Sequence, residues 1–195
     1  MLLIRTKSRA FLLGALAVAL ATQPALAQFS DSYNFLKAVD DRDGAEAEKY
    51  ISEPGSVIIN TKRDGTGETA LHLVVARKDD TWLGYLLQKG ANPNLADRKG
   101  VSPLMLATQL GFTEGVLRLL KYKASVDATN RSGETALIRA VQLRQPELVR
   151  ILLKAGANPD KRDSVAGLSA REYAAQDGRN SAILAIIERG GQADE

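Results

Sequence analysis

The chain reads TALHL at residues 69–73, SPLML at 102–106 and TALIR at 135–139. The first residues of these three stretches lie 33 positions apart, twice in succession, and a weaker copy, SAREY, follows at 169–173. A period of this length is typical of a solenoid in which one small structural unit stacks on copies of itself.

Each copy begins with Thr or Ser, whose side chain can cap the free N–H groups at the start of a helix. A second apolar run follows within each copy: WLGYLL at 82–87, GVLRLL at 115–120, LVRILL at 148–153 and AILAII at 182–187. After the first three runs come turn-forming segments: KGANPN at 89–94, YKASVD at 122–127 and AGANPD at 155–160. Each copy therefore predicts two helices joined by a turn, and stacking is needed because one helix pair cannot bury its own apolar face.

This repeat resembles the ankyrin repeat family. The marks of the resemblance are the period of 33, TALH at Thr69–His72, GANPN at Gly90–Asn94 and the D-x-x-G that precedes a first helix at Asp97–Gly100. The resemblance implies an all-α ankyrin-repeat solenoid of about five helix-turn-helix units joined by β-hairpin-like loops. The expected units are approximately 30–63, 64–96, 97–129, 130–163 and 164–192.

Residues 1–27 have the three-part layout of a secretory signal peptide. A short basic region is followed by an uncharged apolar run at 10–21 and by ALA at 25–27. We expect cleavage after Ala27, which leaves 28–195 as a single ankyrin-repeat domain exported to the periplasm. An uncleaved anchor stays open as the alternative, because the uncharged stretch Ala10–Ala27 is nearly long enough to span a bilayer.

Charge and residue counts exclude several kinds of site. The chain has 26 Lys+Arg and 23 Asp+Glu, and the expected signal peptide carries three of the basic residues and no acid, so 28–195 is formally neutral (26 − 3 = 23 of each sign). A neutral chain has no global basic footprint for nucleic acid or for an anionic membrane. One His and no Cys exclude a His/Cys zinc site, a Cys nucleophile and a disulfide. We expect no metal and no cofactor.

Three positions depart from the resembled pattern. Lys78 and Arg144 stand where the family has Gly after the first helix, and Lys123 replaces the Gly after the second. A residue other than Gly at positive φ costs about 1 kcal/mol. We expect slight strain or local rearrangement in these units.

Two kinds of polar residue invite a catalytic interpretation. His72 ends the T-x-x-H motif, and in the resembled family this imidazole forms local hydrogen bonds and ties neighbouring repeats together. A dyad with a nearby Ser or Thr is the alternative. Acidic residues cluster at Asp40, Asp41 and Asp43 and again at 79–80. We expect these carboxylates to be solvated, at helix ends and loops without a surrounding pocket, instead of forming the paired acids of a hydrolase.

In the resembled family the loop tips and the exposed side of the first helices form one concave surface, here called the candidate strip. By register it takes in Val165 and the candidate partner-binding residues Arg77, Arg98, Lys99, Gln109, Leu110, Arg131, Glu134, Gln142 and Leu143. Leu110 and Leu143 are one repeat apart and are expected to form an apolar centre with a basic rim. Apolar and Arg anchors in a polar surround are typical of protein-binding patches.

These features predict a non-enzymatic, monomeric protein–protein interaction module that binds another protein through the candidate strip in the periplasm. An accessory or chaperone-like factor for a periplasmic stress-defence enzyme is the alternative. A carboxylate-dependent hydrolase is a third possibility, which would need an acid pair aimed into the strip.

Overall fold

The computed structural model describes residues 23–52, 56–176 and 178–191. Within these ranges the chain forms ten α-helices and two short 3-10 helices, and no strand. The first helices of the five pairs are α1 (Gln23–Asp40), α3 (Ala70–Ala76), α5 (Pro103–Gln109), α7 (Ala136–Gln142) and α9 (Ala170–Gln176). The second helices are α2 (Gly44–Ile51), α4 (Asp80–Gln88), α6 (Thr113–Lys121), α8 (Pro146–Lys154) and α10 (Ser181–Glu188). The 3-10 helices are η1 (Ile58–Asn60) and η2 (Gly178–Asn180).

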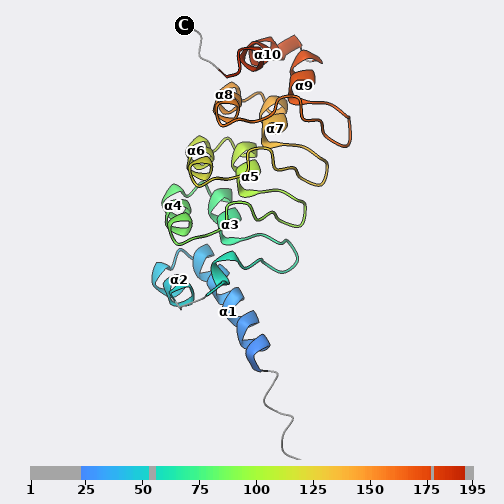
Figure 1. Ribbon diagram of the computed structural model, residues 1–195. Coiled ribbons are helices and arrows are strands. Elements are labelled where there is room, and N and C mark those ends of the chain that lie inside the picture. The colour runs from blue at the N-terminus through green and yellow to red at the C-terminus, as the bar shows by residue number, and fades with distance from the viewer. Residues whose placement is uncertain (1–22, 53–55, 177, 192–195) are drawn as a thin grey trace, which may run out of the picture.

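The five helix pairs stack in chain order into a solenoid (Figure 1). Second helices form one layer, first helices lie beside them, and the loops that join successive pairs project on the far side of the first helices. We call these loops finger 1 (61–68), finger 2 (95–101), finger 3 (128–134) and finger 4 (161–168). The prediction of an all-α solenoid of about five helix-turn-helix units is confirmed.

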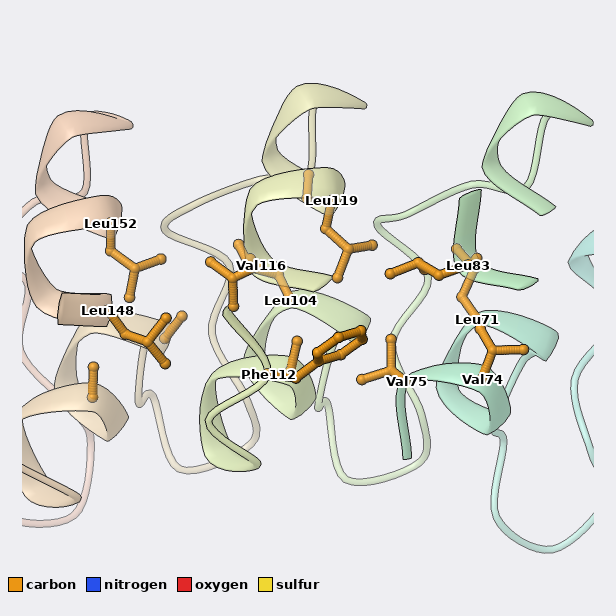
Figure 2. Packing of buried hydrophobic residues seen from close by; sticks show 14 of the residues in the cluster. Leu71, Val74, Val75, Leu83, Leu104, Phe112, Val116, Leu119, Leu148 and Leu152 are labelled. Carbon is orange, nitrogen blue, oxygen red and sulfur yellow. The ribbon is translucent and has the colours of Figure 1, made fainter. Parts of the chain in front are cut away.

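The core runs without a break from pair to pair, because each pair buries apolar side chains against both of its neighbours. The repeated leucines of both helix layers are at most 1% exposed: Leu71, Leu86, Leu104, Leu119, Leu137 and Leu152. Figure 2 shows Leu104 and Leu119 between Leu83 of the preceding pair and Leu148 of the following pair. Truncating such a buried leucine typically costs about 2–5 kcal/mol.

Hydrogen bonds between fingers take the place of a β-sheet. Fingers 2, 3 and 4 each donate one backbone N–H to a carbonyl of the preceding finger: Arg98 to Thr66 at 2.9 Å, Arg131 to Lys99 at 3.1 Å and Ser164 to Ser132 at 2.8 Å. The loops are hairpin-like, but among the described residues the single bridge is an isolated antiparallel one between Arg162 and Ser169. Fingers 1 to 4 are therefore held in a row by backbone contacts that do not depend on side-chain identity.

The expected strain is confirmed at three lysine and arginine positions. Lys78, Lys123 and Arg144 have φ of 54°, 64° and 55°. Arg42, between α1 and α2, has φ of 60° and was missed by the sequence analysis. The turn between the two helices of each of the first four pairs, and the turn after α6, thus take a left-handed residue whether or not it is Gly.

The last pair departs from this rule. Gly111 ends α5 with φ of 63°, as its place in the repeat predicts. Gly178, which the same register places after α9, is not left-handed and instead begins η2. Gly178–Asn180 thus form a 3-10 turn before α10, where the corresponding glycine of the third pair, Gly111, is left-handed.

At the N-terminal end, α1 begins at Gln23 and has 18 residues, against seven in each of the other first helices. It continues across the expected cleavage point after Ala27. The predicted basic and apolar parts of the signal peptide, within residues 1–22, lie outside the described residues. No helix in the described part of the chain is long and apolar enough to cross a membrane.

Candidate partner-binding surface

Three cations stand free on the tips of fingers 2 and 3. Arg98, Lys99 and Arg131 are exposed, and their side chains make no hydrogen bond or ion pair within the described residues. The acidic side chains of the same fingers form hydrogen bonds or ion pairs within the chain. Asp97 Oδ1 accepts the backbone N–H groups of Lys99 and Val101, both at 2.8 Å. The tips therefore carry three cationic groups that no acidic side chain of the described residues pairs with.

Glu134 of finger 3, like Asp97 of finger 2, is bound by groups of this chain. Its carboxylate accepts from the Asn130 amide at 2.7 Å and lies 3.4 Å from Nη1 of Arg139. The same Nη1 donates to Gln142 at 2.8 Å. Glu134, Gln142 and Gln109 are all half-buried. Glu134 and Gln142 belong to a hydrogen-bonding network that stabilises α7. Gln109 forms no such side-chain contact within the described residues.

Apolar side chains are exposed at the C-terminal end of the candidate strip. Leu143, which caps the C-terminus of α7, is 42% exposed, and Val165 at the tip of finger 4 is 80% exposed. Leu110 differs from the expected exposed position, because it is half-buried and packs against the hydrophobic core. The predicted pair of equivalent leucines is corrected to one exposed leucine, Leu143, at the end of α7.

The prediction that Arg77 binds a partner is also corrected, because its side chain is already bound within the chain. Its side chain is 21% exposed, and Nη1 donates to the backbone carbonyl of Val39 at 2.8 Å. Nε lies 3.3 Å from the Asp79 carboxylate, and the guanidinium lies 5.8 Å from the centre of the Trp82 ring. Arg77 joins the first pair to the second and so stabilises the stack.

His72 also joins two pairs. Nδ1 accepts the backbone N–H of Thr69 at 3.1 Å, and Nε2 lies 2.9 Å from the carbonyl oxygen of Val101 in finger 2. This geometry assigns the proton to Nε2, because Nδ1 faces a donor. Burial lowers the pKa of His72 below its usual value, so the neutral form is favoured. The predicted structural role is confirmed: both ring nitrogens hold the fold together.

The sequence pattern of the ankyrin repeat family matches residues 37–130 and 71–163 of this chain. Together the two matches cover most of the solenoid. The chain belongs to the ankyrin repeat family. Ankyrin repeats form protein–protein interaction modules, and this chain is one of them. The matches leave out most of α1 and all of the α9–α10 pair, where the structure departs most from the central repeats.

Individual ankyrin proteins align with the repeat region. The chain is 33% identical over 118 residues to human transient receptor potential cation channel subfamily A member 1, covering 60% of this chain and 10% of that protein. It is 35% identical over 113 residues to an ankyrin repeat-containing protein of Treponema pallidum (strain Nichols), covering 57% and 38%. It is 40% identical over 95 residues to human neurogenic locus notch homolog protein 4, covering 48% and 5%. The chain thus spans less than two fifths of the length of each of these relatives.

The clustered acids mostly serve the ankyrin scaffold. Asp43 and Asp79 cap α2 and α4 by accepting backbone N–H groups at 2.9 and 3.1 Å. Asp80 forms an ion pair with Arg118, which links α4 to α6. An N-cap of this kind typically contributes about 1 kcal/mol.

Asp40 and Asp41 correct one expectation, because they do line a cavity. The cavity has a volume of about 870 Å³ and lies between α1 and finger 1 of the ankyrin stack. Asp40 is ion-paired with Arg63 and Asp41 with Lys37. Both carboxylates therefore already hold cations.

Metal binding is another role that clustered acids can have. Among the described residues, no group of three or more His, Asp or Glu side chains is arranged to hold a metal ion.

Proposed function

We propose that this ankyrin chain binds another protein through the candidate strip. The observation that carries the proposal is the combination, on the candidate strip, of free cations at the finger tips with exposed apolar side chains at the tip of finger 4 and at the end of α7. Arg98, Lys99 and Arg131 supply the cations, and Leu143 and Val165 supply the apolar contacts. Interfaces of this composition use the apolar residues as anchors and the charged residues at the rim.

Rigid presentation is the proposed mechanism. The finger-to-finger backbone hydrogen bonds fix the spacing of the tips before any partner arrives. Binding then orders little besides the contacting side chains, which lowers the entropic cost of association. The chain acts in this proposal as a monomeric, non-enzymatic scaffold, and the ion pairs that engage Asp40, Asp41 and Asp80 favour that interpretation over carboxylate catalysis.

The proposed place of action is outside the cytoplasm, in the periplasm. Support comes from the basic start, the uncharged apolar run at 10–21 and the ALA at 25–27. The measurement is N-terminal sequencing of the protein from the cells that produce it. A first residue of Gln28 in the soluble periplasmic fraction is the expected result. An intact Met1 in the membrane fraction would contradict it and identify an anchored protein.

Site-directed photocrosslinking tests the binding surface. A photoreactive amino acid replaces Leu143 in one variant and Leu117 in a matched control. Leu117 is 51% exposed on α6, in the second-helix layer, so both positions tolerate a large side chain. Irradiation in the producing cells should give a protein adduct from position 143 and none from position 117. Equal adducts from both, or an adduct from 117 alone, would move the binding site off the candidate strip.

A further inference from the structure

We propose that the partner presents an acidic segment to fingers 2 and 3, followed by an apolar residue that docks on Val165 at the tip of finger 4. This inference rests on the proposed function and adds the chemistry of the partner. Two features of this chain carry it: where the unpaired cations are, and where the exposed apolar side chains are relative to them.

The unpaired arginines are confined to the two central fingers. Among the arginines whose side chains the structure describes, Arg98 and Arg131 alone have no hydrogen-bond, ion-pair or ring partner. The others are engaged, as in the following ion pairs: Arg42 with Asp79, Arg63 with Asp40, Arg118 with Asp80, Arg162 with Glu172 and Arg171 with Asp160. A chain that pairs its other described arginines and leaves two adjacent ones free has positive charge available for an external anion.

The cations of the outer fingers are bound within the chain. In finger 1, Arg63 is held by Asp40 and Glu68, and Lys62 donates to the carbonyl of Ala96 at 2.6 Å. In finger 4, Arg162 pairs with Glu172, and Lys161 donates to the carbonyl of Asp127 at 2.8 Å. The cations that this chain leaves without a partner are therefore confined, within the fingers, to fingers 2 and 3.

The two sides of fingers 2 and 3 differ, and the difference gives the partner a direction. On the side of finger 1 the exposed Asp64 has no side-chain partner within the described residues, so its charge opposes further acidic groups. On the other side, finger 4 is joined to finger 3 by the Ser164 to Ser132 hydrogen bond, and its tip presents the exposed apolar side chain of Val165. An acidic segment that fits fingers 2 and 3 is thus repelled at one end and offered an apolar contact at the other.

A protein segment fits this pattern better than nucleic acid does. Three neighbouring cations neutralise few phosphates, and the chain from residue 28 onward is formally neutral. An exposed valine side chain on the finger next to the cations gives a phosphate backbone nothing to bind, whereas a peptide can supply both carboxylates and an apolar side chain. Rim charges act mainly on the association rate, and a central apolar contact acts on the lifetime of the complex.

The experiment follows the backbone amides of the full chain, labelled with 15N, during titration with three probes. The first is a peptide of six glutamates followed by two leucines. The second is the same peptide with glutamine in place of glutamate, and the third is a single-stranded oligonucleotide. The glutamate peptide should shift amides in fingers 2 and 3, with an effect that weakens as salt rises from about 50 to about 200 mM. The glutamine peptide and the oligonucleotide should leave these amides in place.

Charge variants supply the control. Changing Arg98, Lys99 and Arg131 together to Gln should weaken binding of the glutamate peptide by about tenfold or more, since three exposed charge pairs are lost. A matched variant changes three exposed lysines on the second-helix side to Gln: Lys121, Lys123 and Lys154. This control should bind like the unchanged chain. Equal losses in both variants, shifts spread over the whole surface, or binding of the oligonucleotide at the same fingers would overturn the inference.

The outcome separates this inference from the proposed function. A crosslinked partner at position 143 together with no effect of the glutamate peptide on fingers 2 and 3 refutes the acidic segment and leaves the binding module intact. Binding of the peptide without any crosslink at position 143 refutes the proposed use of the strip for a protein in the producing cells.

Discussion

The second and third helix pairs have the same backbone, with a left-handed residue in each of two turns, but they use Lys and Gly in these turns in the opposite order. In the α3–α4 pair the first turn holds Lys78, with φ of 54°, and the second holds Gly90, with φ of 92°. In the α5–α6 pair the first turn holds Gly111, with φ of 63°, and the second holds Lys123, with φ of 64°. Hydrogen bonds around these positions also correspond: the Lys78 and Gly111 N–H groups reach the carbonyls of Val75 and Thr108 at 2.9 and 3.0 Å.

This comparison shows that stacking, not local preference, fixes the turn geometry. A lysine at positive φ is strained, yet it reproduces the conformation that glycine adopts one repeat away. Each pair carries one strained residue and one relaxed residue. The burial of Leu71 and Leu104 against neighbouring pairs is large enough to hold both turns in place.

The largest predicted effects concern the finger glycines, where both pairs should respond alike. A Cβ on Gly67 or Gly100 would lie 2.8 Å from the backbone nitrogen of the next finger, at Arg98 or Arg131. Gly65 has a similar φ of 82° but open space around its Cβ position. Changing Gly67 or Gly100 to Ala should cost about 2–4 kcal/mol, from left-handed strain together with overpacking. Changing Gly65 to Ala should cost only the strain, about 1 kcal/mol.

Urea denaturation of the three alanine variants measures these differences. A loss at Gly67 or Gly100 no larger than at Gly65 would show that the fingers move apart freely. That result would also remove the physical basis for rigid presentation of the tips.

The next prediction separates the two pairs, because the buried polar position differs between them. His72 of the second pair corresponds to Met105 of the third, and both are 1% exposed. Since burial lowers the pKa of His72, the unfolded chain takes up a proton near pH 6.5 before the folded chain does. The free energy of unfolding should therefore fall as the pH drops below about 6.5, by up to about 1.4 kcal/mol per pH unit, until the folded pKa is reached.

Changing His72 to Met gives the second pair the residue that the third pair has at this position. The variant tests whether His72 causes the pH dependence of stability. The variant should lose the fall in stability between about pH 6.5 and 5, although it is less stable than the unchanged chain at pH 8, where Thr69 loses its acceptor. Unfolding curves at both pH values for both proteins give the comparison. An unchanged pH dependence in the variant would assign the titration to other groups.

The period of 33 was enough to predict the stacked helix pairs, because a repeated pattern reports the packing of every copy at once. The structural role of His72 was implied by the resemblance to the ankyrin family. The repeat pattern did not predict contacts and turns that depend on the ends of the stack. Arg77 sits at a register position that is normally exposed, but the way α1 packs brings the Val39 carbonyl within 2.8 Å. Gly178 follows α9 at the usual place, yet the terminal pair forms a 3-10 turn there.

The candidate strip was predictable in position and only partly in composition. Register alone makes Leu110 and Leu143 equivalent, and the structure buries half of the first and exposes the second. Register also cannot tell which charges are free, because ion pairs such as Arg63 with Asp40 join residues that are distant in sequence. The free cations at Arg98 and Arg131 emerge only once such pairs are assigned.

The smallest predicted effect returns to the two turns and tests whether their strain is real. Changing Lys78 or Lys123 to Gly should stabilise the chain by about 0.5–1 kcal/mol, because relief of left-handed strain exceeds the added entropy of glycine in the unfolded chain. Changing Gly111 to Ala should act in the opposite direction by about 1 kcal/mol, since the nearest atom to its Cβ position, on the Gln145 side chain, is 3.4 Å away and leaves backbone strain as the main cost. Opposite signs of the two changes in urea unfolding would establish that the pairs share one backbone and differ only in where the strain lies. A destabilising Lys78→Gly or Lys123→Gly would instead mean that the lysine side chain contributes contacts worth more than the strain it carries.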